Sequence, residues 1–156
     1  MNNQKTIEEF YQAFQNRDAE KMASLYHHDI IFRDPAFGEL KGEHAGNMWR
    51  MLMSQADKNL TIRYSKVQAD ENRGSANWEA DYLFSKTGRY VKNKIKAEFE
   101  FKDGLIYRHT DYFNIWKWSQ MALGPIGYVL GFTPFVKNKI RRQALSGLKK
   151  FEESRN

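Results

Sequence analysis

The sequence predicts an α+β fold in which an antiparallel sheet packs on N-terminal helices and a helical extension follows at the C-terminus. In the first third of the 156-residue chain, apolar residues recur at helical spacing, whereas residues 59–113 alternate with a period of two. Tight turn signals separate the alternating runs. Long strands after a helical segment favour an antiparallel sheet over alternating βαβ units, and the length suits one domain.

The N-terminal helices are predicted from apolar spacing and capping residues. A helix over residues 6–15 is indicated by the i, i+3, i+4, i+7 series Ile7, Phe10, Tyr11 and Phe14. Asp18 is suited to cap a second helix. A short strand at residues 30–32 should end at Asp34, because the residue before a proline avoids the helical region. Gly42 then opens a third helix.

The sheet is predicted from alternation in three later runs. The inner positions of two of them are Ala76, Trp78, Ala80, Tyr82 and Phe84, then Val91, Ile95, Ala97, Phe99 and Phe101. Asp103-Gly104 is a hairpin signal that leads into a last strand. On that strand Tyr107, His109, Asp111 and Phe113 are expected to share one face. Charged residues at the alternate positions predict a solvated outer face, so helices should cover one side only.

Composition and charge exclude several classes of function. The formal net charge is +6, but residues 134–156 hold seven Lys/Arg and two Glu, so the body of the chain is nearly neutral and we expect no nucleic-acid partner. The chain has no cysteine, which excludes disulfides, a thiolate nucleophile and cysteine-bound zinc. The N-terminal residues show no secretory-signal pattern, and we expect a cytoplasmic protein.

His109 and Asp111 are the residues whose pattern indicates chemistry. Lying two apart on a strand, they point the same way, into an otherwise apolar face. A carboxylate there must be paired, hydrated or protonated, and desolvation would raise its pKa toward the range of a general acid or base. The alternative is a satisfied polar pair at the end of the sheet, with Arg108 or Arg63 nearby.

No metal or cofactor site is expected from the other polar residues. The consecutive run His27-His28-Asp29 is predicted at a helix end, where its side chains should diverge. The sequence contains no glycine-rich phosphate loop. We therefore expect any chemistry to be cofactor-free.

Three segments resemble a known superfamily. They are IEEFYQAFQNRDAEKMASLYHHDIIFRDPAFG, GEHAG and FKDGLIYRHTDYF, and they are similar to the SnoaL-like and ketosteroid-isomerase-like branches of the nuclear-transport-factor-2-like superfamily. The resemblance covers residues 5–115. It implies a cone-shaped, strongly curved antiparallel sheet wrapped around helices, with a deep apolar pocket. Residues 116–156 would be an apolar, then basic, helical extension packed on the same domain.

The resemblance also implies roles for individual residues. Asp34 matches the general-base aspartate of ketosteroid isomerases, whereas Phe10 and Ala97 stand where those enzymes have an oxyanion-hole tyrosine and a protonated aspartic acid. Asp111 resembles the acid/base aspartate of SnoaL-type cyclases. The implied catalytic residues are Asp34, Asp111 and His109, and the implied pocket residues are Phe10, Tyr11, Tyr107, Trp78, Tyr82, Ala97 and Phe113.

Two functions follow as hypotheses. The first is binding of a small, largely apolar molecule with cofactor-free acid–base chemistry of the isomerase, cyclase, dehydratase or epoxide-hydrolase type. The second is a non-catalytic ligand-binding or dimerisation module of the same fold. A cavity ending at Asp34 and Asp111 would favour chemistry, and a filled interior would favour the module. A homodimer is expected, because open curved sheets in this superfamily usually bury an exposed face.

The C-terminal extension allows two interpretations. Residues 118–136 carry no charge over nineteen positions, but three glycines and two prolines within them argue against a membrane span. The favoured interpretation is a lid over the mouth of the cone, with Trp116, Trp118 and Tyr128 bordering the cavity. The other is peripheral contact of the basic tail with an anionic membrane. Pro134 suits the start of the final helix.

Overall fold

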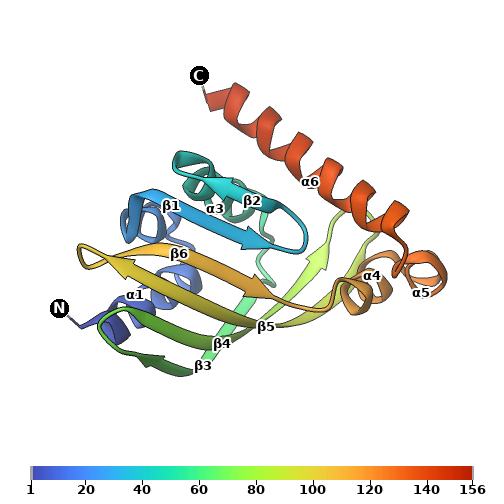
Figure 1. The fold of residues 1–156 in the computed structure, drawn as a ribbon. Coiled ribbons are helices and arrows are strands. Elements are labelled where there is room, and N and C mark those ends of the chain that lie inside the picture. The colour runs from blue at the N-terminus through green and yellow to red at the C-terminus, as the bar shows by residue number, and fades with distance from the viewer. Residues whose placement is uncertain (1, 156) are drawn as a thin grey trace.

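A computed structural model describes residues 2–155 as one curved, open sheet with helices at its inner face and at one end (Figure 1). The elements in chain order are α1 (Asn3–Gln15), α2 (Ala19–Ser24), β1 (Tyr26–Asp34), β2 (Gly38–Lys41), α3 (Glu43–Gln55), β3 (Thr61–Ala69), β4 (Arg73–Phe84), β5 (Arg89–Lys102), β6 (Leu105–Tyr112), α4 (Ile115–Leu123), α5 (Pro125–Leu130) and α6 (Pro134–Arg155). This α+β architecture confirms the predicted fold class.

The sheet is mixed rather than wholly antiparallel. Its six strands lie in the order β2-β1-β6-β5-β4-β3, and every neighbouring pair is antiparallel except β1 and β6. Strand β1 runs the full length from Tyr26 to Asp34 instead of residues 30–32, and the four-residue strand β2 was not predicted. The parallel pair joins the first and last strands of the chain. Because no short turn connects them, no turn signal in the sequence predicts this pairing.

The long central hairpin follows the predicted alternation. Strands β4 and β5 pair without interruption from Arg73 opposite Glu100 to Phe84 opposite Arg89. Along β5, alternate residues from Val91 to Phe99 are buried and those between them are exposed. The Asp103-Gly104 turn has φ values of 55° and 76°, as a tight hairpin turn with two left-handed residues requires.

Capping residues fix the beginnings of the N-terminal helices. Helix α1 begins at Asn3, earlier than predicted, because the Asn2 side chain accepts a hydrogen bond from the backbone N–H of Lys5. Asp18 caps α2 as predicted, accepting from the N–H of Lys21 at 3.0 Å. Gly42 precedes α3 with a φ of 59°, which favours glycine.

The core lies between the inner sheet face and helices α1 and α3. All four predicted residues of the α1 stripe are buried, and α3 contributes Met48, Trp49 and Met51. The rings interlock at right angles: Phe10 meets the ring of Trp49 at a centroid distance of 5.8 Å and an interplanar angle of 79°. Aromatic side chains therefore occupy the centre of the cone.

The C-terminal helices contact the cone at one end and along one edge. Helices α4 and α5 lie at one end of the sheet, and α6 extends from there past β2 and α3 (Figure 1). Helix α6 begins at Pro134 as predicted, and Glu152 near its end bonds to His44 of α3 at 2.6 Å. No helix within residues 2–155 is long and apolar enough to cross a membrane.

Candidate functional site

The parallel pairing of β1 and β6 brings Asp34 and Asp111 onto neighbouring strands at the same level. Phe32 lies opposite His109 and Arg33 opposite Thr110, so the next step of this register is Asp34 and Asp111. Residues two apart on a strand share a face, and both Phe32 and His109 are fully buried on the inner face. The side chains of Asp34 and Asp111 therefore point to the inner face, as those of Phe32 and His109 do.

Asp34 is held by the turn that ends β1. Its Oδ1 accepts hydrogen bonds from the backbone N–H groups of Ala36 at 2.9 Å and Phe37 at 2.6 Å. The pKa of Asp34 is raised from 3.8 to about 7, chiefly by burial and secondarily by repulsion from Asp111. The two backbone hydrogen bonds and the charge of Arg141 on α6 act in the opposite direction. Near neutral pH this carboxyl group is therefore present in both protonation states.

His109 and Asp111 belong to a buried chain of hydrogen bonds. The Trp49 indole N–H donates to the Tyr26 hydroxyl at 2.9 Å, and that hydroxyl lies 2.7 Å from His109 Nδ1. On the other side, His109 Nε2 is 2.9 Å from Asp111 Oδ1, which also accepts from the Trp78 indole at 3.2 Å. With the imidazole proton on Nε2, every donor in this chain has an acceptor.

The relay, as we call Trp49, Tyr26, His109, Asp111 and Trp78, is closed off from water. His109 is 0% exposed and Asp111 is 3% exposed. The rings of Phe10, Phe32 and Phe99 lie 5.5, 5.0 and 4.5 Å from the imidazole centroid. This geometry fits the second hypothesis for His109 and Asp111, in which they form a satisfied polar pair. Tyr26 is the hydrogen-bond partner of His109 in that pair.

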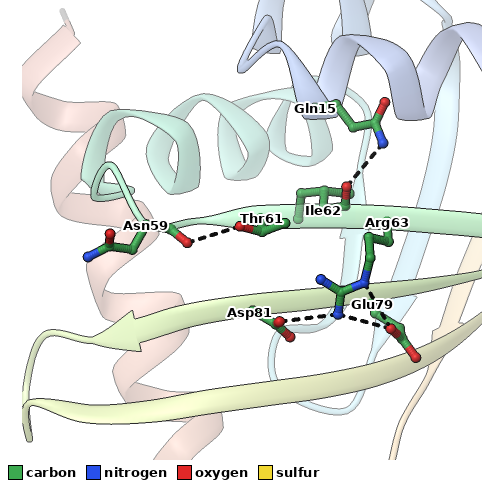
Figure 2. A network of polar contacts seen from close by, with 7 residues as sticks. All are labelled: Gln15, Asn59, Thr61, Ile62, Arg63, Glu79 and Asp81. Carbon is green, nitrogen blue, oxygen red and sulfur yellow. Dashed lines mark hydrogen bonds and ion pairs between the residues drawn. The ribbon is translucent and has the colours of Figure 1, made fainter.

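Neither arginine considered as a partner of Asp111 is bonded to it. Arg63 points to the outer face, where it bonds to Glu79 at 3.0 Å and Asp81 at 3.1 Å. Figure 2 shows this network, with Gln15 of α1 reaching the backbone of β3 on the other side. The Arg108 guanidinium stacks on the Tyr107 ring, 3.9 Å from its centroid. Asp111 consequently receives its hydrogen bonds from His109 and Trp78, and not from an arginine.

Two polar groups inside the cone have unused bonding capacity. The Tyr11 hydroxyl is buried without a hydrogen-bond partner among residues 2–155. Burial, reinforced by the charge of Asp111, holds the pKa of Tyr11 well above its usual range. Asp111 Oδ2 likewise receives no hydrogen bond from residues 2–155, since both of its recorded bonds go to Oδ1. A buried hydroxyl without a partner is costly, so a polar ligand atom or water would be stabilised beside it.

Tyr107 does not share a face with His109, which corrects the sequence analysis. The β5–β6 register shifts between Glu100 and Phe101, so Tyr107 is an extra residue on β6 between Ile106 and Arg108. The Tyr107 ring instead contacts His27 edge-on and helps line an outer hollow of about 490 Å³. The bulge reverses the alternation that the sequence pattern assumed.

The remaining predicted pocket residues fall into two groups. Phe10, Tyr11, Trp78 and Ala97 are buried in the core, whereas Tyr82 and Phe113 are half-buried. The hydroxyl of Tyr82 accepts from the Trp118 indole of α4 at 2.8 Å. A hollow of about 660 Å³ lies on the outer sheet face, and neither it nor the outer hollow beside Tyr107 includes Asp34 or Asp111.

His27, His28 and Asp29 lie on β1, not at a helix end, and their side chains do not diverge. The β1–β6 pairing is irregular here, and the two imidazole rings stack at 4.2 Å. One potential ligand atom from each of the three residues lies within 4.8 Å of the others. His27 is already engaged, because its Nδ1 accepts from the Asp29 N–H and its Nε2 lies 3.5 Å from Asp103.

Sequence reasoning missed Tyr26 and Trp49. The predicted strand begins only at residue 30, although Tyr26, Ile30, Phe32 and Asp34 all stand at even positions and indicate a longer strand. Trp49 carried one weaker signal: a buried indole N–H needs an acceptor. No pattern in the sequence identifies that acceptor, which comes from another element.

The curved sheet and the helices packed on it define a class of protein, and sequence comparison identifies the same class. A family model described as the SnoaL-like domain matches residues 7–109, about two thirds of the chain, and the protein belongs to this family. The match ends within β6, before the C-terminal helices. No curated protein sequence matches the chain.

Solved structures share the fold at low sequence identity. A protein with a ketosteroid isomerase-like fold from Catenulispora acidiphila is 11% identical over 77% of this chain and 93% of its own, with a TM-score of 0.66. A protein described as a polyketide cyclase from Pseudomonas putida is 19% identical over 78% and 98%, with a TM-score of 0.64. An LEH-like epoxide hydrolase from M. tuberculosis is 17% identical over 82% and 95%, with a TM-score of 0.62.

Proposed function

We propose that this protein binds a small, largely apolar molecule beside Asp34 and Asp111 and moves a proton to or from it without a cofactor. The observation that carries the proposal is the placement of two carboxyl groups on adjacent strands, one of them with a pKa of about 7. A group with that pKa is well suited to accept or donate a proton at neutral pH. The surrounding aromatic side chains favour an apolar ligand.

Each polar residue has a distinct role in this proposal. Asp34 takes the proton, because its Oδ1 is fixed by two backbone N–H groups while no residue in 2–155 donates to Oδ2. The unpartnered Tyr11 hydroxyl donates to a ligand oxygen. His109 and Tyr26 are positioning residues that hold Asp111 through the relay.

The structural relatives support this class of chemistry. The names of two of them, a polyketide cyclase and an epoxide hydrolase, describe reactions on small organic molecules. The ketosteroid isomerase-like relative was solved in complex with trimethylamine. Proton transfer at a carbon or oxygen is a step that cyclisation and epoxide hydration share.

A carbon-acid exchange assay tests the proposal without knowledge of the natural substrate. The probe is 2-tetralone, a small apolar ketone, in deuterated buffer, with deuterium incorporation next to the carbonyl followed by NMR. In each turnover the Asp34 carboxylate accepts the carbon-bound proton, exchanges it with solvent and returns a deuteron to the enolate. The wild type should accelerate exchange over buffer, and Asp34→Asn should lose ~100-fold or more of that acceleration.

The control is Asp29→Asn, a change of the same kind at an exposed carboxyl group. It should exchange at the wild-type rate. The wild-type rate should rise through pH 7, because the deprotonated Asp34 is the base. Equal acceleration by wild type and Asp34→Asn, or bound ketone with no accelerated exchange, would overturn the catalytic proposal.

A second function is favoured by the filled interior. The rings around His109 occupy the space where the resemblance implied a pocket, and the relay satisfies its own hydrogen bonds. This supports the dimerisation form of the non-catalytic module, which binds no ligand in its interior. On that hypothesis neither line broadening of 2-tetralone nor exchange should be seen, and mass spectrometry of the purified protein should find no bound small molecule.

We also propose a homodimer formed through the outer sheet face. The helices cover the inner face, so the outer face of β3, β4 and β5 is left in contact with solvent (Figure 1). The hollow of about 660 Å³ lies on this face and includes Arg63, Glu79 and Tyr112. Tyr112 is 50% exposed, which offers an aromatic contact within a charged surface.

A further inference from the structure

Helices α4 and α5 and the turn before α6 expose large apolar side chains to solvent. Val129 and Phe135 are 66% and 68% exposed, and Ile126 is 60% exposed. We define the C-terminal apolar patch by these exposed residues: Trp116, Ile126, Tyr128, Val129, Leu130, Phe132 and Phe135. A lid would have turned Trp116 and Tyr128 toward the cone, but they are 40% and 60% exposed, so the lid interpretation is wrong for them. Trp118, the third predicted lid residue, donates a hydrogen bond to Tyr82 of β4.

Glycines hold this patch outward. Gly127 of α5 packs so closely on α4 that a methyl group there would overlap the Ser119 carbonyl. A methyl group at Gly131 would lie 2.7 Å from the Ser119 side chain. The inner side of the helical hairpin is therefore built from small residues, and the large apolar residues face outward. This is the reverse of the pattern of a helix that faces water, and it indicates that the outer side meets an apolar medium.

The charged residues of the C-terminal segment that carries the patch have one sign. Between Asp111 and Glu152 the sequence has no Asp or Glu and seven Lys or Arg. Lys139 and Arg142 stand four and seven residues after Phe135, which places them on the same side of α6 as this exposed ring. The buried residues of α6, Val136 and Leu148, lie on other sides of the helix than Phe135.

We propose that the C-terminal apolar patch docks on an anionic lipid membrane, with Lys139 and Arg142 contacting the headgroups. An apolar surface bordered by cations fits the boundary between acyl chains and negatively charged headgroups. A second copy of the chain would bring two surfaces of the same positive sign together, which disfavours self-association through this patch. The described helices are too short or too polar to span, so the contact is peripheral.

Vesicle sedimentation of the full chain tests the proposal. The probes are vesicles of phosphatidylcholine alone and vesicles in which ~30% is replaced by phosphatidylserine, at low salt. The wild type should sediment with the anionic vesicles and be released by ~0.5 M NaCl, because the ionic attraction is screened. Each basic residue near such a surface contributes ~1 kcal/mol, so Lys139→Glu with Arg142→Glu should weaken binding by at least ~30-fold.

Matched variants separate the patch from general charge. Lys21→Glu with Lys58→Glu makes the same change of net charge at two exposed residues outside the C-terminal region and should bind like the wild type. Phe132→Ser with Phe135→Ser should also lose binding, while circular dichroism shows an unchanged fold, because both rings are exposed.

Three results would overturn the proposal. The first is a wild type that stays in the supernatant with both kinds of vesicle. The second is equal weakening by the Lys139/Arg142 and Lys21/Lys58 pairs, which would reduce the effect to net charge. The third is a dimer that Phe132→Ser with Phe135→Ser converts to a monomer, which would make the patch a contact between copies. The proton-transfer proposal does not depend on any of these outcomes.

Discussion

Replacing Asp34 by asparagine should stabilise the protein at alkaline pH and leave it almost unchanged in acid. The folded state raises the pKa of this carboxyl group from 3.8 to about 7, so the folded protein binds its proton more tightly than the unfolded chain does. Stability is therefore highest when the group is protonated in both states, below pH 3.8. It falls as the pH rises through the interval up to about 7. Asparagine keeps the acceptor for the Ala36 and Phe37 N–H groups and removes the charge of this half-buried, desolvated carboxyl group.

The size of the effect follows from the shift. The difference between 3.8 and about 7 is roughly three pKa units, which corresponds to at most about 4 kcal/mol at ~1.36 kcal/mol per unit. Between pH 5 and pH 8 the wild type should lose roughly 2.5 kcal/mol through this group alone. Asp34→Asn should lack this loss.

Urea denaturation followed by tryptophan fluorescence at pH 5 and pH 8 measures this pH-dependent loss of stability. The quantity of interest is the free energy of unfolding of Asp34→Asn minus that of the wild type, because other titrating groups cancel in this difference. It should grow by about 2.5 kcal/mol from pH 5 to pH 8. Asp29→Asn, at a side chain that is 63% exposed, should show no such growth. A difference that is constant within about 0.5 kcal/mol would refute the assignment of a desolvated, repelled carboxylate at this position.

Other predictions concern the relay, the helical hairpin and the assembly. Tyr26→Phe removes the hydroxyl that bonds to Trp49 and His109, and it should lower the free energy of unfolding by about 1–3 kcal/mol in urea; an unchanged midpoint would contradict the relay. Gly127→Ala should cost about 1–3 kcal/mol by overpacking α4, whereas Gly147→Ala, with nothing within 4 Å, should be neutral or stabilising; equal melting temperatures of the two variants would argue against the tight contact. Light scattering at micromolar concentration should report two chain masses, and a single chain mass would exclude the proposed dimer.

Local chemistry predicted most of the framework. The apolar stripe of α1 is buried, the Asp18 cap and the Gly42 helix start are as expected, and the Asp103-Gly104 turn joins β5 to β6. These features depend on neighbours within a few residues of one another. They can be predicted from the sequence because the hydrogen-bond partners of each cap and turn lie close to it in the chain, as do the apolar residues that share one helix face.

The site depends on pairings that are far apart in the sequence. The adjacency of Asp34 and Asp111 comes from a parallel pair between the first and last strands, and nothing within either strand specifies its partner. Resemblance to a family pointed to both residues, whereas the spacing of residues pointed to Asp111 but not to Asp34. The predicted orientation of Tyr107 was wrong for a related reason. A bulge changes which face the side chains point to, and no residue such as glycine signals it in the sequence at that position.

The C-terminal segment shows where a hydrophobicity pattern misleads. In the favoured interpretation of its uncharged run, Trp116, Trp118 and Tyr128 face the cone. In α5 the packed face is made by Gly127, whose missing side chain allows the backbone of α4 to approach, and Val129 is left outside. Close packing at glycine brings the backbones of α4 and α5 together. The large apolar residues are then not needed for this contact and remain exposed. A run in which glycines recur among large apolar residues therefore predicts close helix contact and an exposed apolar side together.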